Sequence, residues 1–207
     1  MSRRPPPEDS RAARGGRAEV RATGATAGAL IRVMGIDPGS VVTGYGVIES
    51  DGVRSFHLAH GHIRVRGASF SERLGHIHAA IGEVVAEWHP AEVAIEQVFL
   101  GSNVMSALKL GQARGAAITA VVSRSIPVAE YAPRSIKQVV TGAGGAGKGQ
   151  VQTMVRALLR IEDALQADAA DGLAVAVCHA HSRVGRGEGA MPALPARRRS
   201  RGRGLRL

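Results

Sequence analysis

The order of strand and helix patterns along the chain is the feature that most constrains its fold. Short apolar runs typical of strands come first, and Asp51-Gly52 is a hairpin signal between the second and the third. The expected strands are 32–37, 44–50, 54–66, 92–95 and 127–131. The expected helices are 70–87, 102–123, 133–140, 151–159 and 168–181. Three strands followed by strands that alternate with helices predict an α/β domain with a mixed sheet.

The two ends of the chain differ from its middle in charge and composition. Residues 1–30 carry a net charge of +3 and residues 182–207 carry +7, so together they hold the whole net charge of +10. Both ends are rich in Arg, Gly, Ala and Pro without periodicity, and we expect 1–30 and 183–207 to be disordered basic tails around a domain at 31–182. Such tails could contact nucleic-acid phosphates, and a merely solubilising role is an equally good interpretation.

Cysteine usage and hydropathy indicate a cytoplasmic protein. The single Cys178 excludes an intramolecular disulfide and a multi-cysteine zinc site, and it fits a reducing compartment. No apolar stretch has the length of a membrane span, and the Arg-rich start lacks the apolar segment of a signal peptide. Three His-x-His pairs occur without a fourth ligand, so we expect no zinc site there: His60/His62, His76/His78 and His179/His181.

Four carboxylates are placed where apolar segments end or turn. Asp37 ends "RVMGID" and Glu96 ends "AEVAIE", whereas Asp168 and Asp171 are three residues apart in a helical pattern and share a face. Each alone has a plain structural explanation, as a turn residue, a helix N-cap or a first-turn acid. Together they indicate one cluster, and a cluster of carboxylates suits hard divalent cations such as Mg²⁺ or Mn²⁺. Two such ions can activate a water and stabilise the leaving oxygen of a phosphodiester.

A glycine-rich segment and one aromatic residue offer further candidates. Residues 142–148 match the G-x-x-x-x-G-K pattern of a phosphate-binding loop, but Gly149 stands where that loop needs Ser or Thr, and a helix is expected before it. A flexible loop that exposes Lys148 is the better interpretation, and Lys148 and Lys137 could reach phosphates. Phe99 lies just after Glu96, and we leave open whether it packs in the core or stacks on an unpaired base.

Several strings, taken together over about residues 32–181, resemble the RuvC family of bacterial Holliday junction resolvases. They are "GIDPGSVVTGYGVI", "AIEQVF", "SALKLGQARG", "IKQVVTG", "QVQTMV" and "QADAADGLAVA". The resemblance implies a ribonuclease-H-like fold with a five-stranded mixed sheet flanked by helices. It also implies a homodimer, RuvA and RuvB branch-migration partners, and two Mg²⁺ ions per active site, for which Mn²⁺ could substitute.

The resemblance assigns roles to the same residues that the strand ends single out. Its four catalytic and metal-ligating acids correspond to Asp37, Glu96, Asp168 and Asp171, its DNA-phosphate contacts to Lys137 and Lys148, and its junction-base probe to Phe99. The expected function is a Mg²⁺-dependent endodeoxyribonuclease that resolves four-way DNA junctions by paired symmetric incision, in recombination and DNA repair. Two alternatives are a related nuclease acting on RNA or a hybrid duplex, and a non-catalytic binding module with the same fold.

Two further expectations concern packing. Gly172 lies inside the last helical pattern and should cost about 1 kcal/mol of helix stability relative to alanine. Small residues are spread around the segment 106–122, so a second copy of the chain could pack on it. On that reasoning, Leu110→Glu or Ala117→Arg should separate the dimer.

Overall fold

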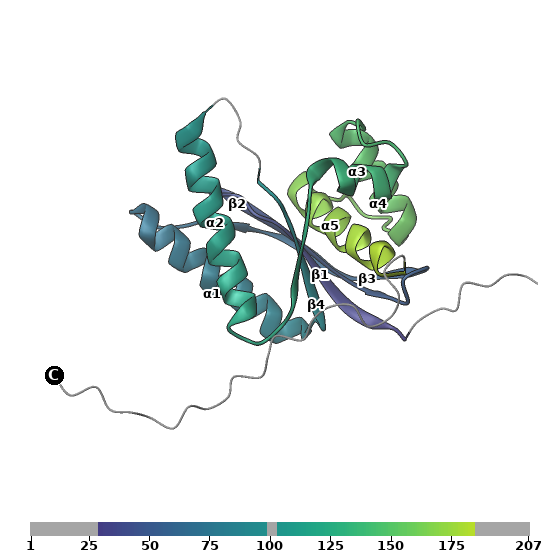
Figure 1. Cartoon of the computed structure of the whole chain (residues 1–207), viewed down its shortest axis with the longest axis horizontal. Coiled ribbons are helices and arrows are strands. Elements are labelled where there is room, and N and C mark those ends of the chain that lie inside the picture. Colours follow the sequence, from purple (N-terminus) through teal and green to yellow (C-terminus); the bar gives the residue numbers. More distant parts are fainter. Residues whose placement is uncertain (1–28, 99–102, 185–207) are drawn as a thin grey trace, which may run out of the picture.

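A five-stranded mixed sheet separates two layers of helices (Figure 1). The computed structural model describes residues 29–98 and 103–184. The strands are β1 (Ile31–Asp37), β2 (Val42–Ser50), β3 (Ser55–Arg64), β4 (Glu92–Glu96) and β5 (Val128–Tyr131). Their spatial order is β3-β2-β1-β4-β5, with antiparallel pairing among the first three and parallel pairing from β1 through β4 to β5. The predicted mixed sheet is therefore confirmed.

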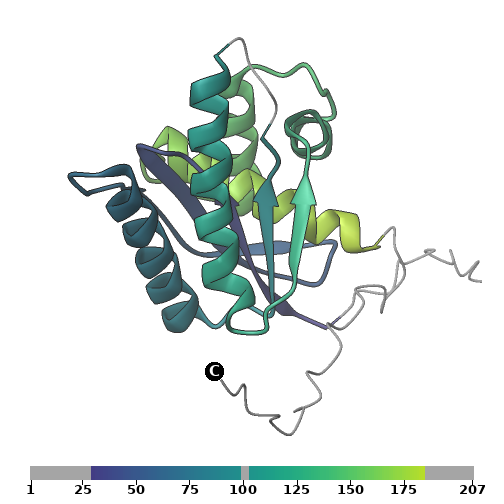
Figure 2. The same cartoon turned by 60° about the vertical axis from the view of Figure 1, so that its left-hand side comes forward.

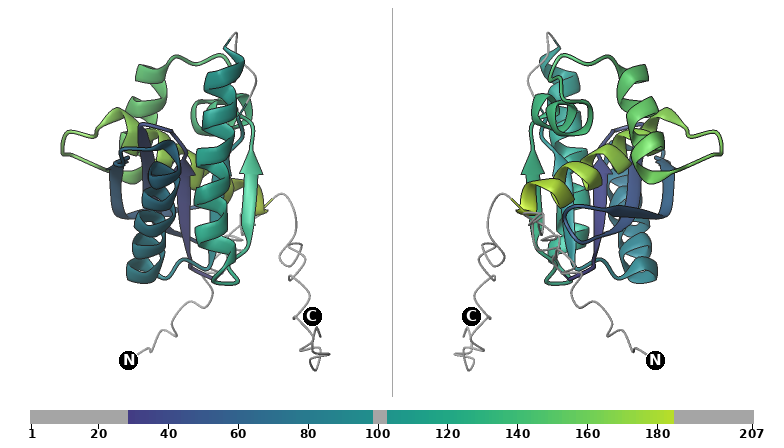
Figure 3. Two further views of the ribbon diagram at one scale, coloured as in Figure 1. Left: turned by 90° about the vertical axis from the view of Figure 1, so that its left-hand side faces the viewer. Right: turned by 90° about the vertical axis from the view of Figure 1, so that its right-hand side faces the viewer.

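The helices divide between the two faces of this sheet, as the opposite views of Figure 3 show. One layer consists of α1 (Phe70–Trp88) and α2 (Val104–Val122), and the other of α3 (Pro133–Thr141), α4 (Lys148–Leu159) and α5 (Ala167–Val184). None of these helices, within the residues described, is long and apolar enough to cross a membrane. Most of the expected tails, at 1–28 and 185–207, lies outside the described residues.

Helix ends agree with expectation to within two residues, except that α4 begins three residues earlier and α5 ends three residues later. The sequence predicts a start at residue 151, whereas the helix begins at Lys148. Gly147 is its N-cap, and the Gln150 side chain accepts a hydrogen bond of 2.9 Å from the Gly147 N–H. This contact explains the earlier start, because it satisfies a backbone donor that the helix itself leaves unpaired. Helix α2 begins after Asn103, whose side chain accepts a hydrogen bond from the Ser106 N–H.

Strand alternation decides which face each carboxylate joins. In β1, Met34 and Ile36 belong to the core under α1 and α2, whereas Val33 belongs to the core under α5. Side chains alternate between faces along a strand, so Asp37 emerges on the α5 side. The same rule applies to β4, where Ala94 packs in the α5 core and Glu96 follows on that side.

Helix α5 lies directly on the backbone of β1 and β2. A methyl group at Gly35 would come within 2.2 Å of the Gly172 carbonyl oxygen, and one at Gly44 within 1.9 Å of the Asp168 carbonyl oxygen. A methyl group at Gly172 itself would lie 2.6 Å from the Tyr45 backbone. The helical cost of Gly172 is therefore accompanied by a close helix-to-sheet approach that any larger residue would obstruct.

Helix α2 has one buried and one open face. Its buried residues are Ala113, Ala117, Ala120 and Val121. Helix α2 lies in front of the sheet in Figure 2. Its exposed and half-exposed residues include a stripe at helical spacing, formed by Val104, Leu108, Gly111, Gly115, Thr119 and Val122. The choice of Ala117→Arg as a probe of a dimer is consequently wrong, because Ala117 is 0% exposed and the variant would disrupt the monomer core.

Candidate active site

Two carboxylates meet where neighbouring parallel strands end. Strands β1 and β4 are paired through Ile36 and Ile95, and the next residue of each is Asp37 and Glu96. Both acids are half-buried, and their carboxyl groups share a hydrogen bond. Carboxyl ends of adjacent parallel strands lie at one edge of the sheet, so this pairing follows directly from the topology.

Helix α5 brings the other two predicted acids to the same edge. Asp168 is the second residue of α5 and an acid of its first turn, so its interpretation as an N-cap is wrong, as is that of Asp171 as the first-turn acid. Asp171 is half-buried, and its charge raises the pKa of both Asp37 and Glu96. Asp168 in turn raises the pKa of Asp171. The four acids therefore lie in one continuous electrostatic cluster, which we call the acidic cluster.

Burial makes this acidic cluster reluctant to ionise. Burial is the largest cause of the raised pKa of Asp37, which reaches about 8, and the adjacent Glu96 is the next cause. Burial likewise raises the pKa of Glu96 and of Asp171. Carboxylates placed this close together are stabilised in their charged form by a cation between them.

Both predicted lysines lie beside the acidic cluster. Lys148 Nζ is 3.4 Å from Asp171 Oδ2, and the pKa of Lys148 is raised chiefly by Asp171. The Lys148 side chain is 82% exposed, so its ammonium group remains accessible from solvent. Lys137 on α3 is half-buried and lowers the pKa of both Glu96 and Asp171.

The donor set suits a hard divalent cation, because it offers carboxylate oxygens alone. Within 29–98 and 103–184, however, no group of three or more His, Cys, Asp or Glu side chains is already arranged to hold a metal ion. In this arrangement the positive charge beside Asp171 is the Lys148 ammonium group. The fold therefore brings the acids close together, but their oxygens are not arranged around a single metal position.

Two residues that sequence reasoning missed hold the ends of the acid-bearing strands. Thr43, which is 0% exposed, exchanges hydrogen bonds with the backbone of Gly39 and fixes the turn after Asp37. Arg114 of α2 donates from Nε to the Glu96 carbonyl oxygen at 3.1 Å and forms an ion pair with Glu130. In the sequence, Arg114 stands out as the only arginine in a helical segment that consists mainly of small and apolar residues.

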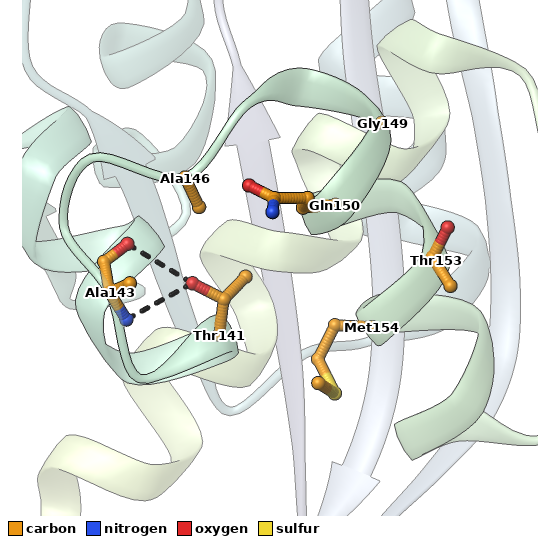
Figure 4. A pocket seen from close by; sticks show the side chains of 7 residues that line it. All are labelled: Thr141, Ala143, Ala146, Gly149, Gln150, Thr153 and Met154. Atoms are coloured by element: carbon orange, nitrogen blue, oxygen red, sulfur yellow. Dashed lines mark hydrogen bonds between the residues drawn. The ribbon is translucent and has the colours of Figure 1, made fainter.

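The glycine-rich loop does not form a nucleotide cradle. It follows helix α3, and its Gly144 and Gly147 N–H groups donate to the side chains of Gln138 and Gln150. A hollow of about 390 Å³ beside it is lined by Thr141, Ala143, Ala146, Gly149, Gln150, Thr153 and Met154 (Figure 4). None of these lining residues is titratable.

The remaining candidates are Phe99 and the His-x-His pairs. Phe99 lies outside the described residues, and its base-probing role stays a prediction. In the first His-x-His pair, His60 contacts His57, at 2.8 Å between ring nitrogens.

Comparison with known proteins identifies the family. The family model described as crossover junction endodeoxyribonuclease RuvC matches residues 33–179. Curated proteins of that description from Psychromonas ingrahamii and Pelobacter propionicus are 51% and 54% identical to this chain, over 72% and 73% of its length and 87% of theirs.

Solved structures agree with the sequence comparisons. T. thermophilus RuvC in complex with a Holliday junction substrate superposes with a TM-score of 0.70 at 35% identity, covering 75% of this chain and 96% of that one. The yeast mitochondrial Holliday junction resolvase Ydc2 has a TM-score of 0.55 at 10% identity, covering 77% and 84% of the two chains, and so shares the fold alone. The predicted ribonuclease-H-like fold is confirmed, and the chain belongs to the crossover junction endodeoxyribonuclease RuvC family.

Proposed function

We propose that the protein is a structure-selective endodeoxyribonuclease that resolves four-way DNA junctions in recombination and repair. The observation that carries this proposal is the acidic cluster: carboxylates from β1, β4 and α5 gather at one sheet edge beside two lysines. The curated relatives, about half identical over most of this chain, bear the name of that activity. A DNA substrate also places the enzyme in the compartment of the chromosome, which in bacteria is the cytoplasm.

Asp37, Glu96, Asp168 and Asp171 would hold two Mg²⁺ ions, or Mn²⁺ in their place. When bound, these ions would supply an activated water and stabilise the oxygen that leaves the scissile phosphate. Asp37 is central because it contacts Glu96 directly and interacts electrostatically with Asp171. Burial of these acids keeps bulk water away from the charges and so strengthens their attraction for a cation.

The two lysines would bind DNA phosphates on either side of the acids. Lys148 suits this role because it is largely exposed and stands at the mouth of the acidic cluster. Lys137 lies close enough to lower the pKa of Glu96, so a phosphate near the acids would also be near its ammonium group. Phe99 would contact bases at the junction, since it follows Glu96 by three residues.

A homodimer would provide the two sites that paired incision requires. The outer stripe of α2 is apolar or small throughout, with Val104 62% and Leu108 54% exposed. Added methyl groups at Gly111 and Gly115 would meet nothing within 4 Å, so a partner helix could approach closely. A two-fold axis through this stripe would relate two identical sites, and hence two symmetric cuts.

Sedimentation at micromolar concentration tests the dimer. Gly115→Arg should give monomers, whereas Ala79→Arg on the exposed face of α1 adds the same charge and should leave the dimer intact. A wild-type protein that stays monomeric both free and on a junction would contradict the dimer and the symmetric mechanism.

Cleavage assays separate the proposed function from its alternatives. We expect a synthetic four-way junction to be cut in Mg²⁺, and an RNA–DNA hybrid of the same length to remain intact. Preference for the hybrid would favour the related ribonuclease, and binding without cleavage would favour the non-catalytic module. RuvA and RuvB are proposed partners, and a junction preloaded with them tests whether they alter the cleavage rate.

A further inference from the structure

A second polar group lies at the far end of α5, buried in the same core that carries the acidic cluster. His179 is 1% exposed, and its Nδ1 is 2.9 Å from the Tyr131 hydroxyl of β5. Its Nε2 is 2.7 Å from Glu92 Oε2, at the start of β4. Arg183 Nε donates to that same carboxylate oxygen at 3.1 Å. These four residues, which we call the α5 anchor, join α5 to β4 and β5.

The α5 anchor is connected to the acids through the sheet itself. Glu92 and Glu96 are the first and last residues of β4. Tyr131 is the register partner of Glu96 in the pairing of β4 with β5, and its carbonyl accepts a hydrogen bond of 2.8 Å from the Gln97 N–H. A displacement of Tyr131 would therefore act on the strand end that carries Glu96.

Between Asp171 and His179, α5 packs on the sheet through apolar side chains and close backbone contacts. Gly35 of β1 faces the backbone of Gly172 and Ala176 of α5. The remaining residues of this stretch are Leu173, Ala174, Val175, Val177 and Cys178. Dispersion and apolar burial are non-directional, so they hold the helix on the sheet without fixing its position along the axis. Hydrogen bonds have defined lengths and directions, and the α5 anchor supplies them.

We propose that His179 is a positioning residue, which fixes the axial position of α5 on β4 and β5 and thereby sets the spacing between Asp171 and the Asp37–Glu96 pair. This inference rests on the proposed function of the acidic cluster. Its effect should be on cation binding and on the cleavage rate, because both depend on the separation of carboxylates. Junction binding through Lys137 and Lys148 should be affected far less.

The test compares three variants of the α5 anchor with a matched core variant, all in the full-length chain. His179→Leu removes both hydrogen bonds while keeping an apolar body, and Tyr131→Phe removes one hydroxyl and is the milder change. Ile81→Ala lies in the core on the other face of the sheet and provides a comparable loss of stability without touching α5. His179→Gln retains a donor toward Glu92 and should restore part of the loss.

Three measurements are made on each variant: Mn²⁺ binding by electron paramagnetic resonance, amide hydrogen exchange of residues 167–172, and junction cleavage at saturating metal. Junction affinity in chelator is measured as well and serves as the control. We expect His179→Leu to weaken Mn²⁺ binding and lower the cleavage rate, each by about tenfold. It should also speed exchange at the start of α5, with junction affinity in chelator unchanged. Tyr131→Phe should shift all three measurements in the same direction by less, and Ile81→Ala should shift none of them.

The outcomes separate this inference from the proposed function. A wild-type protein that neither binds Mn²⁺ nor cuts junctions would refute the proposed function. An active wild-type protein whose His179 and Tyr131 variants match it in Mn²⁺ binding and exchange would refute the positioning role. Equal losses of Mn²⁺ binding and cleavage in Ile81→Ala would refute it too, because general destabilisation would then explain the effect. If His179→Leu does not fold, the same three measurements on Tyr131→Phe decide whether the α5 anchor has a positioning role.

Discussion

Asp37→Asn should make the protein more stable and inactive at the same time. The substitution keeps the size of the side chain and its ability to accept a hydrogen bond, and it removes the ionisable group. The pKa of Asp37 is raised from 3.8 to about 8, largely by burial and by Glu96. Because the folded chain binds this proton more tightly than the unfolded chain, wild-type stability falls as the pH rises from about 4 to about 8. Because asparagine does not titrate, the variant should lack this loss of stability with rising pH.

The size of the effect follows from the pKa displacement. Each pH unit inside this window costs at most about 1.4 kcal/mol, so about 4 kcal/mol accrues between pH 5 and pH 8. Asp37 is half-buried, and screening by water should reduce this to about 2 kcal/mol. For a domain of this size, that free energy corresponds to about 4–8 °C in Tm. The Tm gain of Asp37→Asn should therefore be larger at pH 8 than at pH 5 by about this amount.

Thermal unfolding in chelator at the two pH values measures the gain, and cleavage of a synthetic four-way junction measures activity. Asp163→Asn is the control, because Asp163 is an exposed acid outside the acidic cluster. Adding Mg²⁺ should raise the Tm of the wild type and not that of Asp37→Asn. A Tm gain that is equal at both pH values would refute the buried-charge reasoning. Cleavage by Asp37→Asn near the wild-type rate would refute the proposed role of Asp37 in holding metal.

Three further predictions concern the surroundings of the acids. Lys148→Ala should weaken junction binding and reduce the slope of log affinity against log salt by about 0.9, the value for one lost phosphate contact; an unchanged slope would argue against that contact. Gly44→Ala should destabilise the fold by about 1–3 kcal/mol, measured by urea unfolding, because its methyl group would meet the Asp168 carbonyl. In contrast, Gly75→Ala, with open space around it, should stabilise α1 by up to about 1 kcal/mol. Arg114→Met should cost about 1.5–3 kcal/mol and slow cleavage, and normal activity would show that the Glu96 carbonyl needs no such anchor.

The parts of the site that could be predicted from the sequence are those set by local pattern. Asp37 and Glu96 stand out because each is a carboxylate at the end of a buried strand, and the topology then brings them together. Asp171 follows from helical spacing. Thr43 and Arg114 could not be predicted in the same way, because each acts through a partner on another segment. His179 was considered only as part of a His-x-His pair, a local pattern that hides its contacts with β4 and β5.

The glycines of β1, β2 and α5 show why an acidic cluster of this kind needs the whole fold. Carboxylates repel one another, so nothing in the acids themselves brings α5 close to β1. The approach is made possible at Gly35, Gly44 and Gly172, where backbone meets backbone without side chains between. A helix held at this distance by apolar contact alone would be pushed outward by the charges at its start. Directional hydrogen bonds at its far end, through His179, oppose that push, so the stability of one end of α5 and the chemistry of the other are aspects of a single arrangement.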